Sequence, residues 1–223
     1  MGGYFITSTD TDVGKTTACL CLMKYMKENG KQVACMKPIS AGCDATADGL
    51  RNDDAVKLIS ESSVPLPYEL VNPYAFEPPI APHIAAKQSM TLIELSTIKD
   101  CYDNITKKAD VVIVEGAGGW LVPINDTETM ADIAASLRLP VILVVGIRLG
   151  CLNHALLTVN SIEESGLTMA GWIANHLDKD MPEQDKNVET LERMITAPLI
   201  GIVDYCDHIE HCNIRLNYPS TFQ

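Results

Sequence analysis

The sequence predicts a doubly wound α/β fold, in which helices cover both faces of a mostly parallel sheet. Short β-branched runs alternate with longer helical patterns along the 223-residue chain. Two of the runs, VVIV at 111–114 and VILVV at 141–145, are apolar at every position. A strand without alternation of apolar and polar residues is covered on both faces, as in a parallel sheet. We expect one domain over residues 1–223, because this length is usual for a single domain.

The expected elements alternate between strand and helix. Strands are expected at 4–7, 33–36, 111–114, 141–145, 169–174 and 199–203. Helices are expected at 15–28, at 91–106, over the apolar stripe from 152 to 162, and at 188–196. In the first helix, Ala18, Leu22 and Met26 form one apolar row. Gly30 ends this helix, and Gly166 ends the third.

The segment 64–82 breaks this alternation, because it contains six prolines. Prolines at this density exclude a helix or a central strand. A loop of this length inside a compact domain usually has a function. A surface excursion without a role is the alternative.

Charge and composition limit the class of protein. Lys and Arg total 17 against 29 Asp and Glu, which gives a net charge of −12. We expect no nucleic-acid partner, because such a partner needs a basic face. The longest apolar run is far shorter than the ~20 residues of a membrane span, and the N-terminal residues lack a signal-peptide pattern, so we expect no membrane contact. The eight cysteines contain no CxxC pair, and we expect reduced thiols in a cytoplasmic protein.

The strongest functional signal is S-T-D-T-D-V-G-K-T at 8–16, between the first strand and the first helix. A phosphate binds where backbone N–H groups converge at a helix N-terminus, beside a lysine and a hydroxyl that faces Mg²⁺. Gly14 lets the backbone come close, Lys15 supplies a solvated cation, and Thr16 supplies the metal-facing oxygen. The strict pattern G-x-x-x-x-G-K-[ST] requires glycine at position 9, where Thr9 stands, so an accidental match is the alternative.

Charged residues near other strand ends complete a candidate site. Glu115 follows VVIV, so we expect its carboxylate at the carboxyl edge of a central strand, where doubly wound folds bind ligands. Asp54 is the expected second carboxylate of a Mg²⁺ site with Thr16 and Glu115. The alternative for Asp54 is a favourable charge in the first turn of a helix. Lys37, held between a strand and Pro38, is expected to stabilise a transferring phosphoryl group, and a solvated surface lysine is the alternative.

Nine short motifs follow one another between residues 3 and 203. They are T-D-T-D-V-G-K-T (9–16), K-P-I-S-A-G (37–42), G-L-R-N-D-D-A (49–55), V-N-P-Y-A-F-x-P-P (71–79), A-P-H (81–83), V-E-G-A-G-G-W (114–120), L-P-V-I-L-V-V-G (139–146), L-G-C-L-N-H-A (149–155) and G-W-I-A-N (171–175). Together, in this order and spacing, they resemble the dethiobiotin synthetase family. No single motif is decisive, but their conjunction is specific. The resemblance implies a P-loop NTPase-like fold.

The resemblance also implies a reaction. The chain would close the ureido ring of dethiobiotin from 7,8-diaminopelargonic acid, CO₂ and ATP, releasing ADP and phosphate. A carbamate on one substrate amine would attack the γ-phosphorus, and the second amine would displace phosphate from the resulting carbamic–phosphoric anhydride. The family further implies Mg²⁺ and a homodimer with its active site at the subunit interface.

Site residues carry over by their place in the motifs. The implied catalytic residues are Lys15, Lys37 and Thr11. The implied nucleotide-binding residues are Asp12, Val13, Gly14, Lys15, Thr16, Thr17, Asp54, Glu115, Gly118, Asn175, Val203, Asp204 and Tyr205. The implied substrate-binding residues are Ser40, Ala41, Pro79, Gly150, Cys151, Leu152 and Asn153. Thr11 would hydrogen-bond the carbamate, Asn175 suits the adenine edge, and the helix start at 150–153 would bind the substrate carboxylate.

Three positions depart from the family pattern. Ser8 replaces the usual glycine at the first position of the loop. Asp204 replaces a usual proline, and this replacement leaves the nucleotide preference open. The hydroxyl that usually precedes Gly42 is missing at Ala41, whereas Ser40 carries one. Neighbours in an extended segment point to opposite sides. We therefore expect Ala41 to face the substrate amine and Ser40 to make no direct bond to the substrate.

Two other functions remain as alternatives. A switch ATPase of the partition or iron-protein type typically carries an extra lysine near the start of its phosphate loop, and residues 8–14 contain none. A cobyrinic-acid-type amide synthetase usually needs a separate glutamine-hydrolysing domain, for which this sequence leaves no length.

Overall fold

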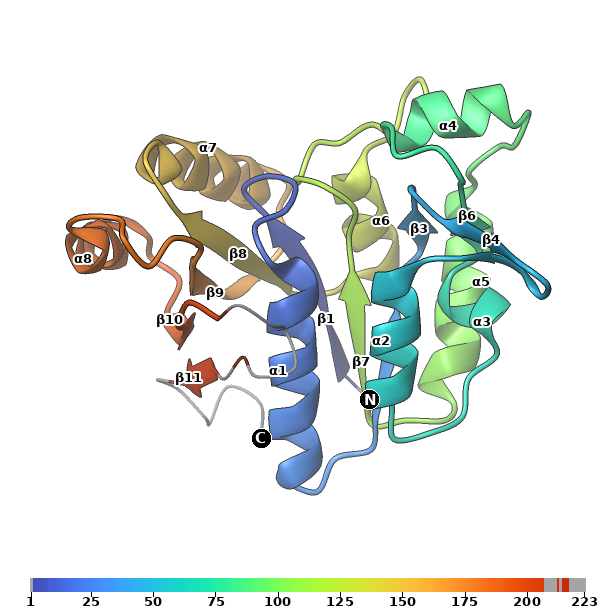
Figure 1. Cartoon of the computed structure of the whole chain (residues 1–223), viewed down its shortest axis with the longest axis horizontal. Coiled ribbons are helices and arrows are strands. Elements are labelled where there is room, and N and C mark those ends of the chain that lie inside the picture. The colour runs from blue at the N-terminus through green and yellow to red at the C-terminus, as the bar shows by residue number, and fades with distance from the viewer. Residues whose placement is uncertain (1, 207–211, 213, 217–223) are drawn as a thin grey trace.

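A seven-stranded sheet forms the centre of the computed structural model, which describes residues 2–206, 212 and 214–216 (Figure 1). The strands are β1 (Gly2–Ser8), β2 (Val33–Met36), β7 (Val111–Glu115), β8 (Val141–Ile147), β9 (Met169–His176), β10 (Leu199–Val203) and β11 (Ile214–Leu216). Their order is β11-β10-β9-β8-β1-β7-β2. Every neighbouring pair is parallel except β10 and β11, so the predicted mostly parallel sheet is confirmed.

All six expected strands are present, and four of them are longer than predicted. β1, β7, β8 and β9 each extend further toward the carboxyl edge. All seven residues of β8 are buried, as its uninterrupted apolar run predicts. β1 pairs with both β7 and β8, so the segments that follow these three strands meet at one edge of the sheet.

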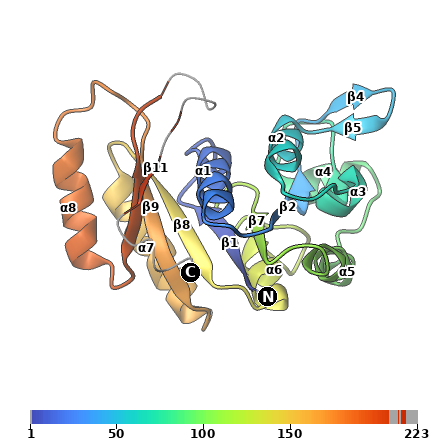
Figure 2. The ribbon, with the colours of Figure 1, turned by 90° about the horizontal axis from the view of Figure 1, so that it is seen from below.

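Helices cover both faces of the sheet. They are α1 (Lys15–Glu28), α2 (Asp53–Glu61), α3 (Tyr68–Val71), α4 (Pro82–Gln88), α5 (Leu95–Thr106), α6 (Met130–Leu137), α7 (Cys151–Glu164) and α8 (Gln184–Met194). α1 lies on one face beside α2, and α5, α6 and α7 lie on the other (Figure 2). The predicted apolar row of α1 is buried against the sheet. Within the described residues, no helix has both the length and the apolar character needed to cross a membrane.

Two helices differ from the prediction at their ends. α5 begins at Leu95, four residues later than predicted, because the preceding Glu94 is extended and its N–H donates to the hydroxyl of Tyr74 (3.0 Å). α8 begins at Gln184, earlier than predicted, in a polar stretch without an apolar signal. It ends before Ile195, which is extended and buries its side chain in the core.

The proline-rich segment contains helical turns, and the prediction that it excludes helix is wrong. α3 begins directly after Pro67, and Pro82 is the first residue of α4. Proline is tolerated at a helix start, because the N–H that it lacks has no partner within the helix there. The segment also carries β6 (Tyr74–Ala75), which pairs in parallel with β3 (Ile39–Ser40) outside the main sheet.

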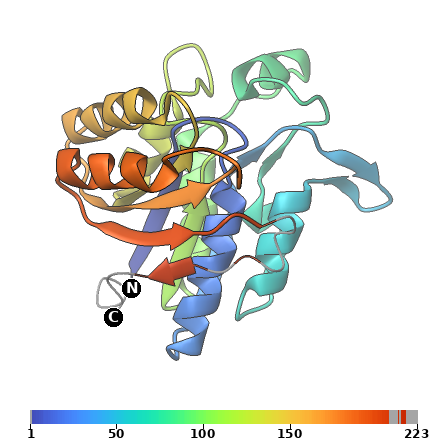
Figure 3. The same ribbon diagram turned by 60° about the vertical axis from the view of Figure 1, so that its left-hand side comes forward.

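The apolar pattern does not predict α2, α6 or the hairpin of β4 (Asp44–Thr46) and β5 (Gly49–Arg51), although local signals for both helices exist. Asn52 caps α2, since its Oδ1 accepts a hydrogen bond from the N–H of Ala55 (3.2 Å). Thr129 and Asp132 form a capping box at the start of α6. The hairpin projects from the body of the molecule (Figure 3).

One pair of cysteines is oxidised, although the sequence predicts reduced thiols. Cys206 and Cys212 form a disulfide, so the prediction of reduced thiols is wrong for these two. β11 returns antiparallel to β10, which brings the two ends of the intervening segment together. The other six are free thiols: Cys19, Cys21, Cys35, Cys43, Cys101 and Cys151.

Candidate active site

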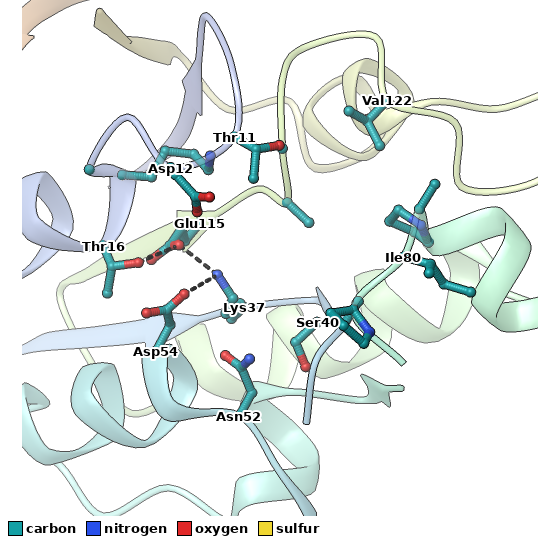
Figure 4. Close-up of a pocket in the computed structure, with 18 of the residues that line it drawn as sticks. Thr11, Asp12, Thr16, Lys37, Ser40, Asn52, Asp54, Ile80, Glu115 and Val122 are labelled. Carbon is teal, nitrogen blue, oxygen red and sulfur yellow. Dashed lines mark hydrogen bonds and ion pairs between the residues drawn. The ribbon is translucent and has the colours of Figure 1, made fainter. Parts of the chain in front are cut away.

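A cavity of about 810 Å³ lies at the carboxyl edge of the sheet, between the loop after β1 and the proline-rich segment (Figure 4). Most residues that the sequence predicts for nucleotide binding, metal binding or catalysis line this cavity. They are Thr11, Asp12, Gly14, Lys15, Thr16, Thr17, Lys37, Asp54, Glu115 and Gly118. Those expected to bind substrate that line it are Ser40, Ala41 and Pro79. The lining residues that were not predicted are Asn52, Ile80, Ala81, Pro82, Ala117 and Val122. The proline-rich segment therefore supplies one wall of the cavity.

Most of the unpredicted lining residues lie within the sequence motifs, but the motifs alone give them no role. Asn52 lies in G-L-R-N-D-D-A, and Ala117 in V-E-G-A-G-G-W. Ala81 and Pro82 belong to A-P-H. Ile80 and Val122 face the cavity only through the fold, and no residue-level signal points to them.

The loop between β1 and α1 depends on a glycine at its end. Gly14 has a φ of +83°, and a Cβ there would lie 2.1 Å from Nδ2 of Asn175. Only glycine fits this position. Asn175 is buried, and its Nδ2 donates to the backbone oxygen of Val13 (2.9 Å). The side chain expected at the adenine edge thus lies against the phosphate loop.

Lys15 is buried rather than solvated, which corrects the sequence-based expectation. Its side chain folds back over the loop, and Nζ donates to Oγ of Ser8 (2.9 Å) and to the backbone oxygen of Asp10 (3.4 Å). Ser8 is itself fully buried, and its hydroxyl also lies within hydrogen-bond distance of the backbone oxygen of Gly118 (3.1 Å). Burial lowers the pKa of Lys15 below the usual lysine value, although the nearby Glu115 carboxylate opposes the shift.

Glu115 is the buried centre of the charged cluster, with an exposed fraction of 1%. The register of β1 and β7 places it beside Ile6, just below the phosphate loop. Its Oε1 accepts hydrogen bonds from Nζ of Lys37 (2.6 Å) and Oγ1 of Thr16 (2.9 Å). Its Oε2 is buried and has no hydrogen-bond partner within the described residues.

Lys37 belongs to the same cluster, so the surface-lysine alternative is wrong. It is buried, and Nζ lies 3.4 Å from Oδ2 of Asp54 as well as 2.6 Å from Glu115 (Figure 4). Burial alone would lower the pKa of Lys37, but the two carboxylates outweigh burial and raise it. The position of Asp54 is consistent with both interpretations of this residue, as a charge at a helix start and as a site carboxylate. It lies in the first turn of α2 and also faces Lys37.

The residues present fit a hard divalent cation that is shared with a phosphate. Among the described residues, no cluster holds three or more His, Cys, Asp or Glu side chains suited to a metal. Two carboxylates and one hydroxyl do lie together, at Asp54, Glu115 and Thr16. The unpartnered Oε2 of Glu115 is an available oxygen ligand. Mg²⁺ typically takes only one or two carboxylates and completes its shell with phosphate oxygens and water.

The expected site residues that lie outside the cavity lining are Val13, Asn175, residues 203–205 and residues 150–153. Val203 is buried at the end of β10, and Tyr205 is 40% exposed. Asp204 stands where the family usually has proline, and its Oδ1 accepts a hydrogen bond from Nη2 of Arg215 on β11 (2.6 Å). The residues 150–153, at the start of α7, do not line the cavity of this chain either.

A parallel sheet, a G-K-T loop leading into α1, and a buried carboxylate on the neighbouring strand define the P-loop nucleoside triphosphatase fold. MinD cell division protein from Aquifex aeolicus shares it (TM-score 0.58, 18% identity, 93% of this chain and 84% of that chain). So does the signal recognition particle receptor FtsY from Elizabethkingia anophelis (TM-score 0.57, 16% identity, 99% of this chain and 61% of that chain). At these identities the likeness shows the fold alone.

Sequence relatives define the family. A family model described as an AAA domain matches residues 2–212. The ATP-dependent dethiobiotin synthetase BioD of Cellvibrio japonicus is 48% identical over 90% of this chain and 88% of its own length. The protein of the same name from Aeromonas hydrophila is 46% identical over 95% of this chain and 94% of its own. This chain belongs to the dethiobiotin synthetase family, as its motifs predict. MinD and FtsY share only its fold.

Proposed function

We propose that this chain is an ATP-dependent dethiobiotin synthetase that closes the ureido ring of dethiobiotin from 7,8-diaminopelargonic acid, CO₂ and ATP. The observation that carries the proposal is the buried Lys37–Glu115–Thr16 cluster, which lies directly beneath the phosphate loop in one cavity. High identity to the synthetases over nearly the whole chain supports it. The cavity offers room for both a triphosphate and a substrate beside it.

The reaction joins two reactive groups in this cavity. The carbamate formed on one substrate amine attacks the γ-phosphorus of ATP, which breaks the bond to the β-phosphate oxygen and releases ADP. The second amine then attacks the carbonyl carbon of the carbamic–phosphoric anhydride, and phosphate leaves. Lys15, the first residue of α1, and Lys37, directly after β2, both line this space, and their charges would offset the negative charge on the transferring phosphoryl group. Thr11 lines the same cavity and would donate a hydrogen bond to the carbamate.

Thr16, Asp54 and Glu115 would hold Mg²⁺ between them and the phosphates. When bound there, the cation neutralises phosphate charge and fixes the orientation of the γ-phosphoryl group. The role of Glu115 is divided between its two oxygens. Oε1 holds Lys37 and Thr16, and the unpartnered Oε2 remains for the cation.

The substrate would extend away from the phosphates along Ala41 and Pro79. Its carboxylate would bind N–H groups at the start of α7, at 150–153, in a second copy of the chain, although the N–H of Cys151 already donates to the backbone oxygen of Arg148 (3.0 Å). Two exposed leucines support such a homodimer: Leu149, just before α7, and Leu157, on α7. The adenine would lie between Asn175 and residues 203–205. This chemistry is that of a cytoplasmic biosynthetic enzyme.

ATP hydrolysis measured with and without 7,8-diaminopelargonic acid plus bicarbonate tests the proposal. We expect ADP release to depend on both, because the carbamate is the acceptor of the phosphoryl group. Hydrolysis that is indifferent to the substrate would contradict the synthetase and favour a switch ATPase.

A further inference from the structure

A buried asparagine behind the cavity uses its whole amide group in hydrogen bonds. Asn72 follows α3 and is 3% exposed. Its Nδ2 donates to the backbone oxygen of Lys37 (2.6 Å). Its Oδ1 accepts hydrogen bonds from Oγ of Ser40 (2.7 Å) and from the hydroxyl of Tyr68 (2.9 Å). One side chain thus joins the peptide of Lys37 to β3, through Ser40, and to α3, through Tyr68.

The hydrogen bonds continue from Tyr68 to the helix that carries Asp54. The hydroxyl of Tyr68 accepts a hydrogen bond from the backbone N–H of Asn52 (2.8 Å). Asn52 is the N-cap of α2, and Asp54 lies in the first turn of that helix. Asp54 faces Lys37 across 3.4 Å. The two ends of this ion pair are therefore connected behind the cavity through Asn72 and Tyr68.

The position of β2 explains why such a connection is needed. β2 is an edge strand, so the chain that leaves it at Lys37 has no further strand of the main sheet to pair with. The segment around Asn72 takes that place. The N–H of Lys37 donates to the backbone oxygen of Val71 (2.9 Å), and the N–H of Tyr74 donates to that of Pro38 (3.2 Å). A long lysine side chain is held in one place only when its backbone is fixed.

We propose that Asn72 and Tyr68 are positioning residues, which fix Lys37 and Asp54 relative to each other without touching ATP or substrate. The inference rests on the proposed function for what Lys37 and Asp54 do, and deepens it. Neither Asn72 nor Tyr68 lines the cavity, so an effect of their substitution is transmitted through the two residues that do. Ser40 is a third branch of the same network, and its hydroxyl is committed to Asn72.

Nucleotide binding tests the proposal independently of turnover. In Tyr68→Phe the ring keeps its contact with the guanidinium of Arg51 (4.1 Å), and only the hydroxyl bridge is lost. We expect the affinity for a non-hydrolysable ATP analogue to fall about threefold to tenfold in excess Mg²⁺, the range of one hydrogen bond, and to stay unchanged in EDTA. The control is Tyr102→Phe, which removes the hydroxyl from a buried tyrosine of α5 outside the cavity lining.

The kinetic signature separates positioning from general structural damage. In Asn72→Ala we expect kcat for dethiobiotin formation to fall about tenfold or more, and KM for ATP to rise by no more than the threefold to tenfold loss of affinity expected for Tyr68→Phe, because the phosphate loop is untouched. Should Asn72→Ala fail to fold, the Tyr68→Phe titration decides alone. Equal losses of affinity with Mg²⁺ and with EDTA, or a Tyr68→Phe variant that matches Tyr102→Phe, would overturn the proposal. A wild-type chain that makes no dethiobiotin would instead contradict the proposed function, and the binding titration would remain interpretable.

Discussion

The ammonium group of Lys37 and the carboxylate of Glu115 lie 2.6 Å apart, and both side chains are almost fully buried. The register of β2 and β7 produces this contact, because it places Met36 beside Val114 and brings the next residue of each strand together. A buried ion pair costs desolvation on both sides, so its net contribution to stability is small. We infer that the pair is retained for the charge it places below the phosphate loop.

This relationship predicts separate effects on stability and activity. Lys37→Met leaves Glu115 charged and buried without its partner, which should lower the free energy of unfolding by about 3–5 kcal/mol. The double variant Lys37→Met with Glu115→Gln removes both charges, and should recover most of that stability while remaining inactive. Urea unfolding and a rate assay on the three proteins check this. A double variant as unstable as the single one would show that the pair itself stabilises the fold.

Substitution of Lys15 should lower the reaction rate strongly and the free energy of unfolding little, unlike substitution of Lys37. Among the residues that the structure describes, the ammonium of Lys15 donates to the hydroxyl of Ser8 and the backbone oxygen of Asp10, and burial disfavours its charge. Lys15→Ala should therefore lower the rate by about 10²–10³ and leave the free energy of unfolding close to that of the wild type. Lys24→Ala, on the exposed side of the same helix, is the matched control. A Lys15→Ala variant that keeps a third of the rate would place phosphate neutralisation elsewhere.

The family pattern has a hydroxyl at the position of Ala41, whereas this chain has one at Ser40 instead. This difference predicts an effect on substrate affinity. The hydroxyl of Ser40 donates to Asn72, whereas Ala41 lines the cavity without a polar group. Ala41→Ser should lower KM for 7,8-diaminopelargonic acid several-fold, since one hydrogen bond is worth about 0.5–1.5 kcal/mol. Ser40→Ala should change this KM little. Steady-state kinetics that show the reverse would mean that Ser40 reaches the substrate.

The buried thiol of Cys35 predicts a pH dependence of stability. Burial raises the pKa of Cys35 to about 12, from the usual thiol value of about 9. Between these values the unfolded chain releases a proton that the folded chain keeps, so this residue's contribution to stability falls as pH rises above about 9. Urea unfolding of wild type and Cys35→Ala across this range isolates the effect. The stability difference between them should shrink with rising pH, and a constant difference would contradict the burial argument.

Much of the site was predictable, because strand ends and loop chemistry are local properties. The apolar run before Glu115 and the G-K-T at the start of α1 place both residues at one edge of any doubly wound sheet. Asn72 was not predictable in the same way. Its role depends on which carbonyl and which hydroxyl lie beside it, and these come from segments about thirty residues away and from a short helix. The prediction that the proline-rich segment contains no helix was wrong for a physical reason. Proline is excluded from the interior of a helix but not from its first turn.

Incorporation of isotopically labelled bicarbonate tests the central claim most directly. The chain is incubated with ATP, Mg²⁺, 7,8-diaminopelargonic acid and the labelled bicarbonate, and dethiobiotin and ADP are quantified by mass spectrometry. We predict that the label appears in the ureido carbonyl, that one ADP forms for each ring closed, and that Lys15→Ala slows the formation of both products by about 10²–10³. ADP formed at the same rate without the diamine, with no labelled product, would contradict the account.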